Sequence, residues 1–217
     1  MTLQTDLDAQ RTGWESRVGE TIARMIAGDI EDLRSSGILE RAARAGDALP
    51  TGTALIDQRG RPFDLAALVA AKPVIVTFYR GGWCPYCNLE LRAYQQALPA
   101  IRAAGAELVA VSFERPDHAL STAEKNDLAF TVLSDTGGAL ASALGIRFTL
   151  SDTVRPFYEK AGHALPERNG DGSWALPMPA TFVVERGGRI RAAFIEPDYR
   201  RRVDPRAALD MLSPMAA

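Results

Sequence analysis

The stretch from Phe78 to Asn88 constrains the fold more than any other part of the chain. It reads Phe-Tyr-Arg-Gly-Gly-Trp-Cys-Pro-Tyr-Cys-Asn and contains both cysteines of the 217-residue sequence. The apolar run from Pro73 to Tyr79 precedes it and is typical of a strand buried on both faces of a sheet. Apolar residues then recur at helical spacing, at Leu91, Tyr94, Leu98 and Ile101, with Glu90, Arg92, Gln95 and Arg102 expected on the opposite side. The two thiols are therefore predicted to lie in a strand-to-helix turn.

The predicted position of Cys84 at the start of a helix decides its chemistry. Unpaired backbone N–H groups and the positive end of the helix dipole favour thiolate over thiol there. Cys87, one turn further on, lies within disulfide reach and is the natural partner to resolve a mixed disulfide or a sulfenic acid. Arg80 adds a positive charge nearby, and Pro85 is tolerated in the first helical turn. Cys84 and Cys87 are thus the predicted catalytic residues.

Two aromatic residues flank the cysteines. Trp83 is interpreted as a shield that keeps water from the disulfide, with ordinary core packing as the alternative. Tyr86 is expected to be exposed beside the pair, where its hydroxyl could hydrogen-bond to a bound peroxide or to glutathione. Arg80, Trp83 and Tyr86 are therefore candidate supporting residues.

A metal-binding interpretation of the cysteine pair is weak. Two cysteines spaced two apart supply half of a zinc site, and four ligands are normally needed. His118 and His163 are the only histidines, and no second paired motif accompanies them. We expect neither a metal nor a cofactor, and a purely structural cysteine pair remains the other alternative.

Charge and hydropathy restrict the partners of the protein. A net charge of −2 and a pI near 5.8 offer no electrostatic field for nucleic acid. The sequence contains no basic start followed by an apolar core and no apolar run of membrane-spanning length, so a cytoplasmic location without membrane attachment is expected. In a reducing compartment, a close cysteine pair is more often catalytic or metal-binding than structural. The expected partners are small molecules or protein thiols.

The chain divides by pattern into an N-terminal helical extension, residues 1–45, and a main domain, residues 46–217. The extension has an apolar stripe, and Gly28 with Asp29 is expected to separate two helices within it. The stripe consists of Leu7, Trp14, Val18, Ile22, Met25 and Ile26. It is interpreted as covering part of the chain's own core, and a homodimer contact is the alternative.

The main domain alternates predicted strands and helices. A hairpin around 57–61 leads to a short helix capped by Asp64, and strands are expected at 107–113 and 130–133 with helices at 117–126 and 137–144. The resulting β-α-β units place the cysteine turn at the carboxyl end of a strand. Residues 146–177 are interpreted as an insertion that roofs the active site. A hairpin of 181–185 with 190–195 and a helix from Asp204 complete the chain.

Five further segments carry a resemblance to a known family. They are 77–79 before the cysteine turn, 110–112, 123–128, 130–135 and 179–184. With the cysteine turn, these segments resemble the thioredoxin-fold proteins, and within them the peroxiredoxin-like AhpC/TSA (alkyl hydroperoxide reductase and thiol-specific antioxidant) family. The resemblance runs from about Gly46 to Ala208. It implies an α/β fold of thioredoxin-like type, with a central mixed sheet flanked by helices.

The resemblance also implies a cis-proline packed against the cysteine pair. Pro179 occupies the corresponding place before a strand, and an ordinary trans-proline is the alternative. A cis bond there would let the main chain of Met178 bind an extended thiol substrate. Met178 and Pro179 are therefore expected to support substrate binding.

This sequence departs from the family pattern at several positions. Peroxiredoxins carry a Pro-x-x-x-Thr/Ser-x-x-Cys motif that ends in the peroxidatic cysteine. Aligning that cysteine on Cys87 puts Arg80 at the proline and Cys84 at the Thr or Ser, and the usual arginine falls at Pro179. In thioredoxins, a buried carboxylate stands where this chain has Thr77. The residues that bind peroxide in peroxiredoxins are thus largely replaced by residues of thioredoxin type.

Two functions fit these observations. The first is a thiol-dependent peroxidase, in which a hydroperoxide oxidises one thiolate, Cys84 and Cys87 form a disulfide, and a thioredoxin-like or glutathione donor reduces it. The second is a thioredoxin- or glutaredoxin-like oxidoreductase, in which Cys84 attacks a protein or glutathione disulfide. Family similarity favours the peroxidase, whereas the chemistry of the Cys-Pro-Tyr-Cys motif favours the oxidoreductase.

Overall fold

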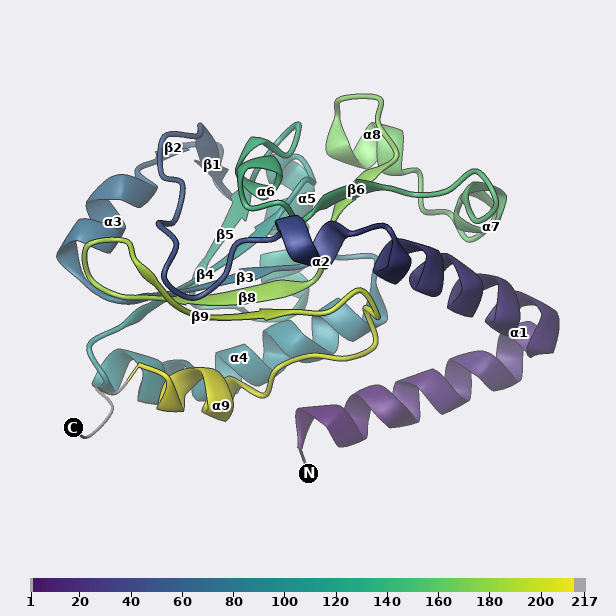
Figure 1. The fold of residues 1–217 in the computed structure, drawn as a ribbon, viewed down its shortest axis with the longest axis horizontal. Helices are drawn as coiled ribbons and strands as arrows, with labels where there is room; N and C mark the ends of the chain where they lie inside the picture. Colours follow the sequence, from purple (N-terminus) through teal and green to yellow (C-terminus); the bar gives the residue numbers. More distant parts are fainter. Residues whose placement is uncertain (1, 213–217) are drawn as a thin grey trace.

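A seven-stranded mixed sheet forms the centre of the computed structural model, which describes residues 2–212 (Figure 1). The strand order is β2-β1-β5-β4-β3-β8-β9, and only the β3/β4 and β4/β5 pairs are parallel. The strands are β1 (Leu55–Asp57), β2 (Pro62–Phe63), β3 (Val74–Phe78), β4 (Glu107–Ser112), β5 (Thr131–Ser134), β8 (Ala180–Val184) and β9 (Ile190–Ile195). A separate antiparallel ribbon pairs β6 (Arg147–Thr149) with β7 (Ala175–Pro177). The predicted mixed sheet is confirmed.

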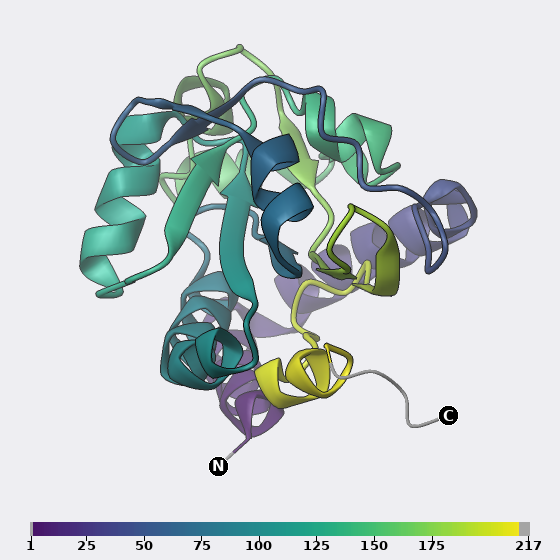
Figure 2. The ribbon, with the colours of Figure 1, turned by 90° about the vertical axis from the view of Figure 1, so that its left-hand side faces the viewer.

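Helices cover both faces of the sheet (Figure 2). One face packs against α2 (Ile38–Arg41), α3 (Leu65–Ala71) and α6 (Ala139–Ala143). The other packs against α4 (Pro85–Ala103), α5 (Pro116–Lys125), α9 (Pro205–Asp210) and the start of α1 (Leu3–Ser35). Two short helices, α7 (Arg155–Lys160) and α8 (Leu165–Asn169), lie in the segment between β6 and β7.

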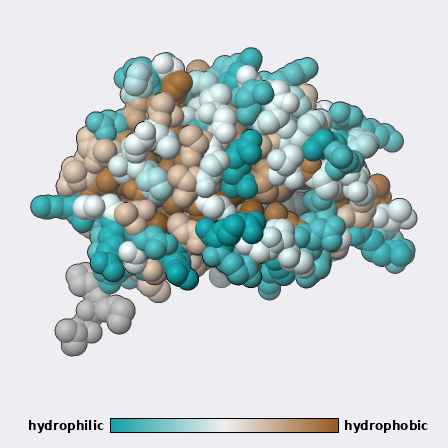
Figure 3. Space-filling view, turned by 45° about the horizontal axis from the view of Figure 1, so that its top comes forward, coloured by the Kyte–Doolittle hydropathy of each residue, from teal (hydrophilic) through white to brown (hydrophobic). Residues whose placement is uncertain are grey.

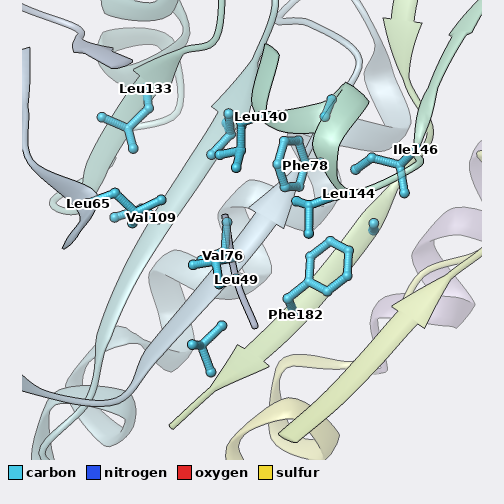
Figure 4. Close-up of a cluster of buried hydrophobic side chains, with 14 of the residues drawn as sticks. Leu49, Leu65, Val76, Phe78, Val109, Leu133, Leu140, Leu144, Ile146 and Phe182 are labelled. Carbon is cyan, nitrogen blue, oxygen red and sulfur yellow. The ribbon is translucent and has the colours of Figure 1, made fainter. Parts of the chain in front are cut away.

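Strand β3 joins the two halves of the core. All five of its residues are buried, as its unbroken apolar sequence predicts. Because side chains alternate along a strand, Val76 and Phe78 belong to the cluster shown in Figure 4, while Ile75 packs against α4 on the other face. The strand that leads into the cysteine turn is therefore held rigidly from both sides.

The extension differs from its prediction in where it bends. Helix α1 continues through Gly28 and Asp29 to Ser35, and its break lies at Gly19, which has φ 79° and ψ 165°. The break divides α1 into a first arm, residues 3–18, and a second arm, residues 20–35, which form a V in Figure 1. Gly28 stays helical because the cost of one glycine in a helix, about 1 kcal/mol, is small.

Both arms of α1 pack on the chain's own core. Leu7 of the first arm is fully buried in the cluster beneath α4, and Ile26 and Ile30 of the second arm are buried against the segment 150–176. The interpretation that the stripe covers the chain's own core is thus confirmed.

The remaining predicted elements lie within a few residues of their expected positions. The predicted hairpin is β1/β2, and Asp64 caps α3 by accepting a hydrogen bond of 2.8 Å from the Ala67 amide.

Hydrophilic and hydrophobic residues are interspersed over the face shown in Figure 3. Within residues 2–212, no helix combines the length and the apolar character needed to cross a bilayer.

Candidate active site

Cys84 is the N-cap residue of α4, directly after the turn that follows β3. Its backbone is extended (φ −85°, ψ 116°), and its amide donates to the Gly81 carbonyl at 3.1 Å. The turn approaches α5 so closely that a Cβ on Gly82 would lie 2.0 Å from the Thr122 hydroxyl oxygen. The Gly82 amide donates to Glu114 Oε2 at 2.8 Å, which fixes the turn against the end of β4. The predicted strand-to-helix turn is confirmed.

Arg80 is a buried cation beside both sulfurs. Its Nη1 lies 3.9 Å from Cys84 Sγ, and its backbone N–H donates to Cys87 Sγ at 3.4 Å. The guanidinium lies 3.8 Å from the ring centre of Tyr199 and also donates to the Tyr158 hydroxyl. Aromatic faces stabilise a buried guanidinium by cation–π attraction. Arg80 is therefore held as a permanent charge at the sulfurs, as the sequence predicts.

The pKa values of the two thiols are shifted in opposite directions. Burial acts to raise the pKa of Cys84, but a hydrogen bond from the Cys87 thiol and the charges of Arg80 and Arg202 outweigh it and lower the pKa to about 6. Burial, together with the neighbouring Cys84, raises the pKa of Cys87 well above its usual range. At neutral pH the pair is therefore one thiolate at Cys84 and one thiol at Cys87.

A buried ion pair lies behind Cys87. Arg202 Nε donates to Glu90 Oε2 at 2.7 Å, and Arg202 Nη2 donates to Cys87 Sγ at 3.5 Å. The prediction that Glu90 faces solvent is wrong, because Glu90 lies three residues after Cys87 and four before Tyr94 and so shares their buried helix face. Burial, opposed by the charge of Arg202, raises the pKa of Glu90 to about 7.

A pocket of about 370 Å³ opens onto Cys84. We call it the aromatic pocket, because six aromatic rings line it together with Arg80, His163 and a few residues of α1. The rings belong to Trp14, Trp83, Tyr86, Phe157, Tyr158 and Tyr199. Cys84 is 1% exposed and lines this pocket, whereas Cys87 does not.

Tyr86 and Trp83 both take part in this lining. The prediction that Tyr86 is exposed is wrong, because its ring packs edge-to-face on Tyr199 with 5.5 Å between ring centres. Trp83 packs on Tyr158 at 5.6 Å and on His163 at 4.6 Å. Within the described chain, the Tyr86 hydroxyl, Trp83 Nε1 and Arg80 Nε are buried without a hydrogen-bond partner. These three groups are hydrogen-bond donors without a partner, and their residues line the aromatic pocket.

The segment 146–177 roofs this pocket, as the sequence predicts. Helix α7 contributes Phe157 and Tyr158, and His163 follows in the loop before α8. Burial and the nearby Arg168 and Arg80 lower the pKa of His163, so its ring is neutral at neutral pH. The roof is therefore apolar and aromatic rather than charged.

The sequence model of the AhpC/TSA family matches residues 45–193 of this chain. The chain belongs to the AhpC/TSA family. It is 31% identical over 122 residues to the chloroplastic peroxiredoxin Q of Sedum lineare, which covers 56% of this chain and 64% of that protein. It is 34% identical over 109 residues to the peroxiredoxin Q of Populus jackii, covering 50% of each. The chain thus spans about half to two thirds of the length of these curated relatives.

Solved structures bear out the thioredoxin-like fold of this AhpC/TSA protein. The crystal structure of peroxidoxin BcpB from Mycobacterium tuberculosis superposes with a TM-score of 0.62 at 21% identity, covering 80% of this chain and 99% of that one. The family match begins at residue 45, so helix α1 lies outside it.

Met178 and Pro179 do not take the positions expected for them in this AhpC/TSA protein. No peptide bond is cis within the described residues, so Pro179 is trans. The Met178 amide donates to the Ile146 carbonyl at 2.7 Å, and the Met178 side chain is buried in the cluster on the opposite face of the sheet. The ribbon of β6 and β7 therefore uses the backbone group that was expected to bind substrate.

Pro179 instead lines a second pocket of about 420 Å³, which we call the polar pocket. Glu90, Thr181 and Arg202 line it as well, so it borders the ion pair behind Cys87. The Thr77 hydroxyl pairs with that of Thr181 at 3.1 Å. The buried carboxylate of Glu90, whose pKa is raised, also hydrogen-bonds to Thr77.

Sequence reasoning missed Glu114, Tyr158, Tyr199 and Arg202 as site residues. Each reaches the cysteine turn from a distant part of the chain, and local periodicity does not report such contacts. Glu90 differs from these four, because its spacing from Cys87 and Tyr94 could have shown that it lies on the buried face of α4. Within the described residues, no three or more His, Cys, Asp or Glu side chains are grouped to hold a metal.

Proposed function

We propose that this protein is a thiol-dependent peroxidase in which Cys84 reduces a hydroperoxide. The observation that carries the proposal is the position of a Cys84 sulfur of low pKa at the base of the aromatic pocket, beside Arg80. The thiolate, not the thiol, is the nucleophile towards peroxide oxygen. The names of the peroxiredoxin Q relatives agree with this activity.

The first step breaks the peroxide O–O bond. The Cys84 thiolate attacks the terminal oxygen, Cys84 becomes a sulfenic acid, and the remaining alkoxide takes a proton to leave as an alcohol. Negative charge develops on the departing oxygen, and fixed donors are most effective where charge develops. Arg80, whose Nη1 lies 3.9 Å from Cys84 Sγ, provides such a donor beside the sulfur.

The second step closes the disulfide. Cys87 loses its proton and attacks the Cys84 sulfenic acid, which forms the Cys84–Cys87 bond and releases water. Glu90, with a pKa of about 7 and coupled to Cys87 through Arg202, is suited to accept that proton. The polar pocket links the Glu90 carboxylate to solvent.

Thiol reductants complete the cycle, because one dithiol or two monothiol molecules give two electrons and two protons to the Cys84–Cys87 disulfide and are themselves oxidised to a disulfide. We propose a thioredoxin-like or glutathione-type donor, acting in the cytoplasm, and we retain a homodimer as a proposed assembly. The alternative of a protein-disulfide oxidoreductase is less well supported by the geometry. Cys84 lines a pocket walled by α1 and α7, whereas Pro179, which is trans, lines the polar pocket. None of the residues that line the aromatic pocket belongs to a strand, so an extended peptide would find no strand to pair with beside the Cys84 sulfur.

Stopped-flow oxidation of the reduced protein by hydroperoxide tests the proposal. We expect a second-order rate constant at least about a hundredfold above that of a free thiol of the same pKa, since positioning and electrostatics contribute at least this much. A rate no better than that of the free thiol would reject the peroxidase. Rapid reduction of a peptide disulfide in the same preparation would then support the oxidoreductase.

A further inference from the structure

The first arm of α1 forms one wall of the aromatic pocket. Gln10, Trp14 and Arg17 lie at i, i+4 and i+7 and so share one face of the helix, and all three line the pocket. Trp14 meets Phe157 of α7 edge-to-face with 6.3 Å between ring centres. The family match starts at residue 45, so this wall is an addition to the family domain.

The arm is anchored at both ends, which makes the wall a fixed part of the site. Leu7 is fully buried beneath α4, and Glu15 lies 3.6 Å from Arg200 in an ion pair that joins the arm to the segment after β9. The bend at Gly19 then turns the second arm back over the segment 150–176 (Figure 1). Trp14 and Arg17 are thereby held opposite the roof.

The pocket is larger than its simplest oxidant requires. A volume of about 370 Å³ has room for about 12 water molecules at roughly 30 Å³ each, whereas hydrogen peroxide is only slightly larger than one water. Six of the thirteen lining residues are aromatic, and aromatic rings pack favourably against another ring. Shape and lining therefore favour an organic hydroperoxide with an aromatic body.

Apart from the Cys84 thiolate, the charged side chains that line the aromatic pocket are cationic. Arg80 lies at its base and Arg17 at its outer edge, where Arg17 is exposed and also lines an adjoining surface hollow. No Asp or Glu is among the residues that line the aromatic pocket, and the described chain offers Arg17 no carboxylate within ion-pair distance. Arg80 faces the Cys84 thiolate, which leaves Arg17 to attract a second negative charge.

From this arrangement we propose that the first arm of α1 makes the pocket selective for aromatic hydroperoxides that carry a carboxylate. The hydroperoxide group lies at Cys84 and Arg80, the ring packs among Trp14, Trp83 and Phe157, and the carboxylate faces Arg17. The inference rests on the proposed function, because it names the substrate class of the same sulfur. Trp14 and Arg17 act as specificity-determining residues.

The test compares cumene hydroperoxide with its para-carboxylate and with hydrogen peroxide on the full-length reduced protein. The carboxylate is expected to react fastest. Arg17→Gln should lower the rate of oxidation by the para-carboxylate about fivefold, which is the effect expected from losing one exposed charge pair. The rates with the other two oxidants should not change. Arg24→Gln, at another exposed arginine that lies in the second arm and does not line the pocket, is the matched control and should change none of the three rates. Trp14→Ala should slow both aromatic oxidants about tenfold and spare hydrogen peroxide.

Binding of para-isopropylbenzoate, which has no peroxide, separates this inference from the peroxidase activity. Calorimetry should detect binding to the wild type and to Arg24→Gln, and weaker binding to Arg17→Gln. If para-isopropylbenzoate bound but hydroperoxides did not oxidise Cys84, the peroxidase activity would be rejected and the preference for aromatic carboxylates would stand. Fast oxidation by hydrogen peroxide, with no preference for the carboxylate and no effect of Arg17→Gln, would overturn the inference and retain the peroxidase. Circular dichroism of each variant checks that α1 stays folded.

Discussion

Glu90 and Arg202 form an ion pair of 2.7 Å in which each side chain is only 2% exposed. Removing two charges from water costs several kcal/mol per ion, so a pair this deep is weak support for stability by itself. Its contact with Cys87 gives it another role, since Arg202 also donates to that sulfur at 3.5 Å. The pair therefore couples the charge state of a carboxylate to that of the resolving thiol.

Replacing one partner of this ion pair should destabilise the fold more than replacing both partners. Glu90→Leu leaves Arg202 as an uncompensated buried charge, and we expect it to lower the free energy of unfolding by about 3 to 5 kcal/mol. The double variant Glu90→Leu with Arg202→Leu should recover most of that loss. Urea unfolding followed by circular dichroism measures both. Equal losses for the single and double variants would show that the two side chains stabilise independently.

The two cysteines should trap different species after oxidation. In Cys87→Ser the Cys84 sulfenic acid has no resolving partner, so a dimedone adduct on Cys84 should accumulate after one equivalent of hydroperoxide. In Cys84→Ser the remaining thiol is buried, away from the aromatic pocket and of raised pKa, and should react at least about a hundredfold more slowly. Mass spectrometry of each variant locates the adduct. A sulfenic acid formed rapidly on Cys87 in Cys84→Ser would reverse the assigned order of attack.

The pH dependence of oxidation follows from the Cys84 pKa of about 6. Raising the pH through this value deprotonates the thiol, so the second-order rate should rise with pH, reach half its maximum near pH 6 and then level off. Arg80→Gln removes one of the charges that lower this pKa, and the midpoint should move to higher pH. Thiolate absorbance near 240 nm measures the titration independently of peroxide. An unchanged midpoint in Arg80→Gln would exclude Arg80 as a cause of the low pKa.

The fold around the cysteine turn could be predicted because its signals are local. An apolar run, two glycines and a 3.6-residue period within 73–101 are enough to define strand, turn and helix. The same locality explains what was missed. Arg202 contacts Glu90 and Cys87 from more than 110 residues away, and Tyr158 meets Arg80 across 78 residues. No periodicity in the sequence brings such segments together.

Two errors have their own physical reasons. The position of Tyr86 next to the cysteines predicts an exposed ring, yet the C-terminal segment carrying Tyr199 covers it. Pro179 and Met178 were assigned by family resemblance alone, and here the β6/β7 ribbon takes up the Met178 amide.

The bend in α1 provides a last prediction, in which two glycine substitutions act in opposite directions. Gly19 has φ 79°, a backbone conformation that residues with a side chain rarely adopt. Nothing lies within 4 Å of a Cβ added there, so backbone strain alone opposes Gly19→Ala. We expect a loss of about 1 to 2 kcal/mol in the free energy of unfolding. Gly28 is helical and equally unobstructed, so Gly28→Ala should instead stabilise by about 0.5 to 1 kcal/mol.

Thermal and urea unfolding of the two variants side by side measure these shifts. Since the bend sets the position of the first arm, Gly19→Ala should also weaken binding of para-isopropylbenzoate, whereas Gly28→Ala should leave it unchanged. If Gly19→Ala were neutral in stability and in binding, α1 would not need its bend, and the pocket wall formed by Trp14 and Arg17 would have to be assembled in another way.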